Sequence, residues 1–153
     1  NNSGGWRYLE VAPAEIEQMA WFFNEEKFSS DLNTQQNIGE GKKNTGVILS
    51  FLASRGEWNR AAQVCDELEI NGFDDWFLPS FLELSLLYGN LHRKGLGGFR
   101  NDPYWSSTIR QDGSPYNPYY PVAMNFADGL NEGYWPNRTS GRVNVYVRAI
   151  RQF

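Results

Sequence analysis

The stretch Gly72-Phe-Asp-Asp-Trp-Phe-Leu-Pro-Ser80 sets the order of elements in the middle of this chain. Its glycine suits the left-handed backbone position that comes after a helix. Pro79 forces Leu78 toward extended geometry, so a helix on the N-terminal side cannot continue through it. Ser80-Phe-Leu-Glu83 is a capping box, in which the serine hydroxyl accepts from the amide three residues on and Glu83 reaches back. The sequence therefore predicts a helix that begins after Ser80 and runs to about Leu91.

Two helical segments are expected before this stretch. Apolar residues repeat at helical spacing across residues 44–53, with Asn44 or Thr45 as the predicted N-cap. Residues 58–69 continue that helix or form a second one, which is expected to end at Asn71-Gly72.

Short strands are expected toward both ends of the chain. Residues 6–11 alternate large apolar and polar side chains, as a half-buried strand does, and are expected to begin the sheet. From Gly95 onward, glycine, proline and asparagine separate short strands. The last strand, residues 142–153, is expected to put valines on one face and Asn144, Tyr146 and Arg148 on the other.

The predicted core consists of large apolar side chains from these segments: Trp76, Phe77, Leu78, Trp105, Phe126, Val147 and Ile150. Arg148 and Arg151 are expected to pair with acidic groups such as Asp128 or Asp74, because a guanidinium in a half-buried strand needs a carboxylate.

Length and charge exclude several classes of protein. A chain of 153 residues is predicted to form one domain, residues 1–153. The net charge of −4 and the absence of a Lys/Arg run argue against nucleic acid as a partner. No apolar run approaches the roughly 20 residues of a membrane span, so direct membrane insertion is not expected. The single cysteine, Cys65, lies in a helical stretch and is interpreted as a buried structural residue.

Neither a metal site nor a catalytic site is predicted. Asp74 and Asp75 offer paired carboxylates, but calcium takes six to eight oxygens and the chain has no calcium-loop pattern. We expect both to tie down the turn while Trp76 enters the core. The lone His92 has no companion ligand, and Ser106-Ser-Thr108 has no base, so the triplet is expected to bond strand backbone and hold Trp105 inward. No cofactor is expected.

Four short segments in fixed order carry a family resemblance: Gly72–Ser80, Tyr104-Trp-Ser-Ser-Thr108, Asn125-Phe-Ala-Asp-Gly129 and Val147-Arg-Ala-Ile-Arg151. With Gly5–Glu10, Asn44-Thr45 and Ala61–Asp66, they span nearly the whole chain. In these segments the chain resembles the DUF1566 family, which includes the C-terminal domain of the Legionella collagen-like adhesin. The resemblance implies an α+β, C-type-lectin-like (formylglycine-generating-enzyme-like) fold with two main helices, short antiparallel strands and long loops. Formylglycine-generating oxidases use active-site cysteines, so with Cys65 alone the chain is not expected to be an enzyme.

The region 104–146 is the candidate binding region. Its loops are rich in Tyr, Trp, Asn, Ser, Gly and Arg, the residues that antibody-like paratopes favour. Composition alone favours ordinary polar loops equally. The resemblance adds that some relatives are variable proteins of diversity-generating retroelements, in which asparagine-type codons near the C-terminus are randomised. The predicted ligand-binding residues are Ile109, Arg110, Tyr116, Asn117, Tyr119, Tyr120, Asn131, Tyr134, Trp135, Asn137, Arg138, Asn144 and Tyr146.

The resemblance therefore implies a display domain that binds a protein or other cell-surface ligand through a variable surface. It also implies a place on the bacterial surface or outside the cell, through a lipoprotein anchor that this chain lacks. The alternative is a fixed adhesin domain that binds carbohydrate or glycosaminoglycan, which would need a local cluster such as Arg100, Arg138 and Arg142 to offset the acidic charge.

Overall fold

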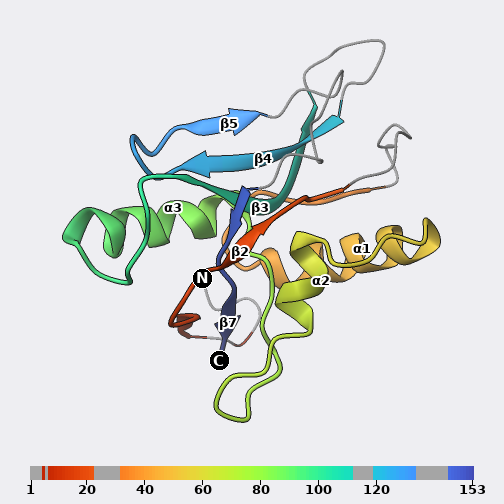
Figure 1. Ribbon diagram of the computed structural model, residues 1–153, viewed down its shortest axis with the longest axis horizontal. Helices are drawn as coiled ribbons and strands as arrows, with labels where there is room; N and C mark the ends of the chain where they lie inside the picture. Colours follow the sequence, from red (N-terminus) through yellow and green to blue (C-terminus); the bar gives the residue numbers. More distant parts are fainter. Residues whose placement is uncertain (1–4, 6, 23–31, 112–118, 134–144) are drawn as a thin grey trace.

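The computed structural model describes residues 5, 7–22, 32–111, 119–133 and 145–153. These residues form an α+β fold, which confirms the predicted class (Figure 1). α1 and α3 are the longer helices, and α2 is a short helix between them. In chain order the elements are β1 (Leu9–Val11), β2 (Ile16–Met19), α1 (Gly41–Ser54), α2 (Ala61–Asp66), α3 (Phe81–Asn90), the 3₁₀ turn η1 (His92–Lys94), β3 (Pro103–Gln111), β4 (Tyr119–Asn125), β5 (Asn131–Gly133), β6 (Val145–Val147) and β7 (Ile150–Gln152).

The strands form a five-stranded sheet in the order β2-β6-β3-β4-β5 and a separate pair, β1-β7. In Figure 1, α3 lies on one side of β3, and α1 with α2 lies on the other. Neighbouring residues of β3 accordingly enter different buried clusters, Trp105 the cluster under α1 and α2 and Tyr104 the cluster beside α3. This is the alternation of a strand that is covered on both faces. No helix in the described ranges has both the length and the apolar character of a membrane span.

The stretch that comes after α2 forms a tight hairpin turn before it enters the core. Asn71 and Gly72 have φ of 53° and 79°, and Ile70 and Phe73 exchange two backbone hydrogen bonds of 3.0 Å around them. Two successive residues at positive φ are typical of a type I′ turn. The prediction that Asn71-Gly72 ends a helix is wrong, because α2 ends at Asp66 and these residues instead reverse a short hairpin.

The capping box at Ser80 is confirmed. The Glu83 amide donates to Ser80 Oγ at 3.3 Å, and the Ser80 amide donates to Glu83 Oε2 at 2.7 Å. α3 runs from Phe81 to Asn90, within one residue of the predicted end. The predicted core is also confirmed, since each of its members is at most 3% exposed.

α1 begins four or five residues before the sequence indicates. Its N-cap is Glu40. The two predicted caps, Asn44 and Thr45, are instead buried inside the first turns of the helix. A Cβ placed on Gly41 would collide with Glu83 Oε2 and with the Ser80 amide. A glycine therefore lets the start of α1 abut the start of α3, a tertiary contact that no local pattern announces.

A buried polar cluster, here called the polar junction, joins the starts of both helices to β3. Its members are Asn44, Thr45, Ser80, Glu83, Ser107 and Thr108, all at most 2% exposed. Asn44 Nδ2 donates to Ser107 Oγ at 3.1 Å, the Leu78 amide donates to Thr45 Oγ1 at 3.1 Å, and the Phe81 amide donates to Thr108 Oγ1 at 3.0 Å.

Glu83 lies at the centre of the junction. Its Oε1 accepts from the Gly39 amide at 2.8 Å, in addition to the bond from Ser80 to Oε2. Burial raises the pKa of Glu83, while the amides of Ser80, Gly39 and Gly41 limit the rise. The carboxylate thus supplies the acceptors for amides that precede both helices.

The triplet Ser106–Thr108 interrupts the ladder between β3 and β4. The register shifts between Trp105 and Ile109, and inside this bulge Ser106 Oγ donates to Val122 O at 2.6 Å. Trp105 is fully buried, and its Nε1 donates to Met19 O at 2.8 Å. The predicted structural role of the triplet is confirmed.

The C-terminal stretch is two strands and not the single strand predicted. β6 belongs to the five-stranded sheet, whereas β7 pairs with β1 and bridges to Phe77. Within the predicted strand 6–11, Leu9–Val11 form β1, which belongs to the two-stranded sheet. Arg148, at the break, is buried rather than facing outward, and its Nε donates to Ala12 O at 2.7 Å and its Nη2 to Gly97 O at 2.6 Å. Through these two bonds the Arg148 side chain satisfies backbone carbonyls on the inner side.

Both C-terminal arginines pair with carboxylates, but with other ones than Asp128 or Asp74. Arg148 Nη1 lies 3.3 Å from Glu15 Oε2. Arg151 lies 2.7 Å from Asp75 and 2.9 Å from Glu10. These carboxylates come from the N-terminal segment and the adjacent hairpin, which the separate β1-β7 pair brings close.

Candidate ligand-binding surface

The described part of the predicted binding set divides among three places on the sheet. Members outside the described residues are Tyr116, Asn117, Tyr134, Trp135, Asn137, Arg138 and Asn144. The others lie on β3, β4, β5 and β6: Ile109, Arg110, Tyr119, Tyr120, Asn131 and Tyr146.

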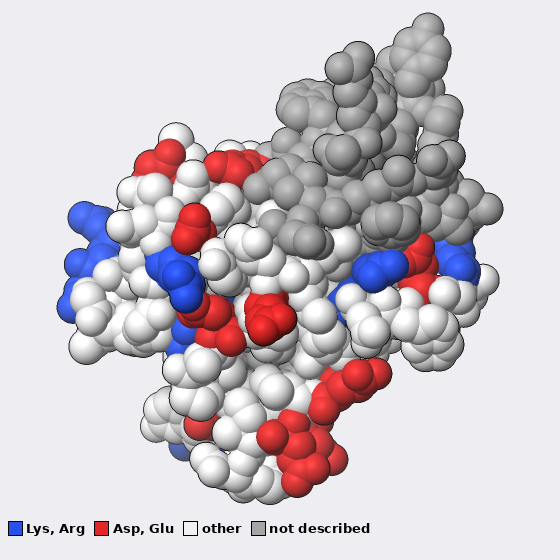
Figure 2. Space-filling model, in the orientation of Figure 1, with Lys and Arg blue, Asp and Glu red and all other residues white. Residues whose placement is uncertain are grey.

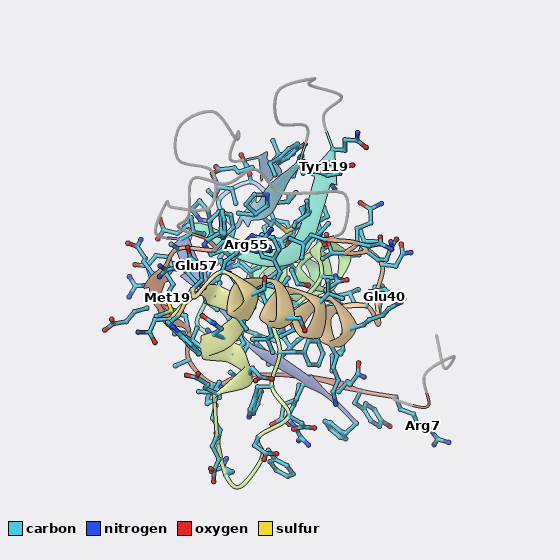
Figure 3. All side chains as sticks on the ribbon, turned by 90° about the vertical axis from the view of Figure 1, so that its right-hand side faces the viewer. Arg7, Met19, Glu40, Arg55, Glu57 and Tyr119 are labelled. Carbon is cyan, nitrogen blue, oxygen red and sulfur yellow. The ribbon has the colours of Figure 1, made fainter. Side chains whose placement is uncertain are left out.

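The open end of the β3–β4 hairpin carries the first group. Arg110 stands opposite Tyr120, and the flanking residues Ile109 and Tyr119 pack against the cluster under α1. The Arg110 guanidinium lies 4.4 Å from the centre of the Phe81 ring, which fixes it over the start of α3. The four side chains therefore lie close together along the hairpin, but Arg110 and Tyr120 face one side of the sheet while Ile109 and Tyr119 face the other. Tyr119 and Arg7 lie at opposite ends of the molecule in Figure 3.

Asn131 and Tyr146 lie away from that end. Asn131 is exposed on β5, where it pairs with Met124, about 13 Å along β4 from Tyr120. Tyr146 is half-buried on β6 beside Tyr104, about 20 Å along β3 from Arg110. The described members thus do not form one continuous patch.

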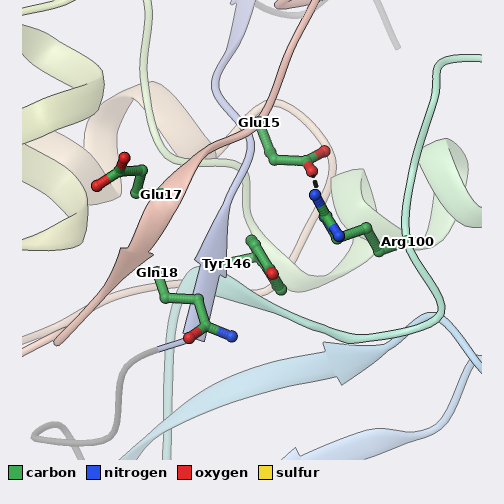
Figure 4. Close-up of a pocket in the computed structure, with 5 residues that line it drawn as sticks. All are labelled: Glu15, Glu17, Gln18, Arg100 and Tyr146. Atoms are coloured by element: carbon green, nitrogen blue, oxygen red, sulfur yellow. Dashed lines mark hydrogen bonds and ion pairs between the residues drawn. The ribbon is translucent and has the colours of Figure 1, made fainter.

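Tyr146 lines a pocket of about 520 Å³ with residues that were not predicted to bind ligand (Figure 4). The other lining residues are Glu15, Glu17, Gln18 and Arg100. A bulge in β2 builds its wall: Ile16 pairs with Val147 and Met19 with Val145, so two residues of β2 oppose one of β6. Glu17 and Gln18 therefore both stand across from Tyr146, and bulges commonly re-aim side chains in this way.

Two of the lining residues, Arg100 and Glu15, form an ion pair. Arg100 Nε donates to Glu15 Oε1 at 2.6 Å, and the Arg100 guanidinium lies 5.2 Å from the centre of the Tyr146 ring. The hydrogen bond to Glu15 raises the pKa of Arg100. Burial, together with the charge of Glu15, raises the pKa of Tyr104 to about 12. At neutral pH, Arg100 is therefore charged and Tyr104 is neutral.

The sequence offers little sign of this pocket. It indicates Arg100 only as part of a cationic cluster, yet Arg100 is paired with Glu15. The β2 residues escape prediction because the bulge removes the alternation that marks a strand.

The described residues offer no group of three or more His, Cys, Asp and Glu side chains that could hold a metal ion. Trp76 is in the core as predicted, and Asp75 pairs with Arg151. Cys65 is fully buried, and burial raises the pKa of its thiol, so it is held as a thiol without access to a substrate. His92 lies in η1 and bonds to Asn101 Oδ1 at 3.0 Å.

No protein-family model matches this chain, and no curated protein matches it. The DUF1566 resemblance thus stays a prediction that rests on the four sequence segments. The fold and the surface together define an α+β domain with a polar pocket at one edge of its larger sheet.

Proposed function

We propose that this protein is a ligand-binding display domain of a bacterial surface protein, with a C-type-lectin-like fold of the DUF1566 kind. In this proposal it is a variable protein of a diversity-generating retroelement, and its ligand is a protein or other molecule of a cell surface. The binding surface consists of the β3–β4 hairpin end, β5, β6 and the connecting segments.

One observation carries the proposal: in the described part of the candidate region, the fully buried residues are different from those predicted to bind. Val122, Ala123 and Met124 of β4 are at most 2% exposed, whereas Tyr119 and Tyr120 on the same strand are half-buried. Asn131 is exposed beyond them. An exposed side chain such as Asn131 can be exchanged with little cost in stability, which a diversified surface requires.

The experiment is sequencing of the encoding locus in its genomic context. We expect an adjacent reverse transcriptase gene and a near-copy of the segment that encodes about residues 104–153, differing mainly at adenines. The codons that differ would name the ligand-facing residues. A locus without the copy and without the reverse transcriptase would leave the fixed adhesin as the better proposal.

A fixed adhesin domain that binds glycosaminoglycan receives little support from the charged side chains of the described residues. Arg100 is paired with Glu15. The other two members of the proposed cationic cluster, Arg138 and Arg142, lie outside the described residues. On the face in Figure 2, both signs of charge are scattered, and acidic side chains gather at the lower end, where the hairpin after α2 lies in Figure 1. A sulfated polymer needs clustered cations.

A further inference from the structure

The pocket beside Tyr146 presents hydrogen-bonding groups that the fold does not use. The side chains of Glu17 and Gln18 are exposed, and neither makes a hydrogen bond or ion pair with a described residue. Arg100 is held through Nε, which leaves the two terminal nitrogens of its guanidinium without a described hydrogen-bond partner. Figure 4 shows Gln18 and Arg100 flanking Tyr146. The pocket thus offers both donors and acceptors to a ligand.

The charges around the pocket cancel. Glu15 and Glu17 contribute two carboxylates, while Arg100 lines the pocket and Arg148 contacts Glu15 from behind, which gives two guanidiniums. A strongly anionic ligand would meet Glu17, and a strongly cationic one would meet Arg100. The balance favours a neutral ligand that is rich in groups able both to donate and to accept hydrogen bonds.

The pocket is also held in place before any ligand arrives. Gln18 and Glu17 sit on a bulge between two strand pairings, and Tyr146 packs with its ring centre 5.9 Å from that of Tyr104. Arg100 is fixed by Glu15. A volume of about 520 Å³ lies in the range of small-molecule sites. Arg100 and Tyr146, which are already positioned, lose little entropy on binding, which matters for a small polar ligand.

We infer that this pocket binds a neutral sugar ring. Gln18 and Glu17 bond its hydroxyl groups from the β2 side, the terminal nitrogens of Arg100 donate to its oxygens, and Tyr146 forms the floor. Hydroxyl groups supply the mixed donors and acceptors that the lining demands, and they bring no charge. The site rests largely on β2 and on the segment before β3, outside the candidate variable region, so it stands or falls separately from the proposed diversification.

Saturation-transfer difference NMR with three neutral probes tests this inference: methyl α-D-glucoside, methyl α-D-mannoside and methyl β-D-galactoside. We expect the wild-type protein to transfer saturation to the ring protons of at least one probe. Gln18→Ala should weaken that binding about tenfold, because a hydrogen bond in the site is lost. Gln111→Ala is the matched control, since Gln111 is also exposed but lies at the far end of β3, and it should leave the affinity unchanged.

A second pair of variants tests the charge balance. Glucose 6-sulfate should bind the wild type no more tightly than the neutral glucoside. Glu17→Gln leaves the pocket with one excess guanidinium and should tighten binding of glucose 6-sulfate, whereas Glu69→Gln, at an exposed position on the hairpin after α2, should not. The inference is overturned if no neutral probe receives saturation, if Gln18→Ala binds as the wild type does, or if Glu17→Gln leaves the sulfated sugar unaffected. None of these results bears on the locus experiment.

Discussion

The polar junction and the pocket both consist of polar side chains, but they use them in opposite ways. In the junction, Glu83 is fully buried and accepts from amides that precede two helices. In the pocket, Glu17 is exposed and its side chain bonds to no described residue. Buried polar groups have to be paired, whereas exposed ones do not. The fold therefore restricts which residues can occupy the junction, whereas the residues of the pocket can be chosen for binding a ligand.

Removing each carboxylate in turn should give the largest difference in stability between the two regions. Glu83→Ala leaves the buried Ser80 amide and the partly buried Gly39 amide without an acceptor, and it should lower the free energy of unfolding by about 3 kcal/mol or more. Glu17→Ala should change it by at most about 0.5 kcal/mol. Urea unfolding followed by tryptophan fluorescence measures both. Similar losses for the two variants would show that the junction contributes no more to stability than the pocket does.

Asn44 should show the second-largest effect. Its Oδ1 accepts from the Gln35 amide at 2.8 Å, and its Nδ2 donates to Gln35 O at 2.6 Å and to Ser107 Oγ. Asn44→Ala removes all three bonds and should cost about 2 kcal/mol. Asn33→Ala is the control and should be nearly neutral, since the bond that Asn33 Oδ1 accepts from Gln35 Nε2 is exposed. A neutral Asn44→Ala in the same urea experiment would contradict the proposed link between α1 and β3.

The pair Asp75–Arg151 should show a smaller effect that depends on pH. The hydrogen bond from Arg151 lowers the pKa of Asp75 from its ordinary value of 3.8. The stabilisation is therefore fully present above pH 3.8 and is lost as the pH falls through the lowered pKa. Asp75→Asn should cost about 1 kcal/mol or less at neutral pH, because the pair is partly exposed.

Urea midpoints at steps from pH 7 down to below 3.8 measure this loss. The difference between wild type and Asp75→Asn should shrink as the pH falls through that range. The neighbouring Asp74 is exposed and makes no ion pair with a described residue, so Asp74→Asn should give a smaller difference. A gap between wild type and Asp75→Asn that stays constant with pH would rule out the ion pair as its cause.

The hairpin end should show the smallest effects. Arg110→Ser removes the contact with Phe81 and a 3.3 Å bond to Gln36, at a cost of about 0.5 kcal/mol. Asn131→Ser should be neutral within about 0.5 kcal/mol. Thermal melts of the single and double variants check this. A loss of several kcal/mol at either position would remove the basis for a surface that tolerates diversification.

Local signals in the sequence predict the parts of the fold that local contacts decide. The capping box at Ser80 spans four residues, and the apolar spacing of α1 lies within one helix, so both are visible in the sequence. The start of α1 is misplaced because it depends on Gly41 fitting against Glu83, a contact between helices that share no sequence pattern.

The pocket escapes prediction for the same reason. Tyr146 stands out by its residue type, but its neighbours Glu17 and Gln18 lie more than a hundred residues earlier and reach it only through the antiparallel pairing of β2 with β6. Strand alternation puts Arg148 on the wrong face, because the alternation does not continue through the point where the chain leaves one sheet for the other. Nothing local marks such a switch.

The pairing of β1 with β7 also bears on how the protein folds. Leu9 stands opposite Gln152, and the Arg7 amide donates to Phe153 O at 2.9 Å, so the first strand finds its partner only among the last residues of the described chain. Closing so long a loop is entropically costly, and contacts of this separation slow folding. During synthesis, β1 must wait for β7 to leave the ribosome, and until then Phe77 lacks its bridge to Ile150. In synthesis order β7 is therefore the last described strand to pair, and its pairing with β1 and its bridge to Phe77 complete the fold of the described residues.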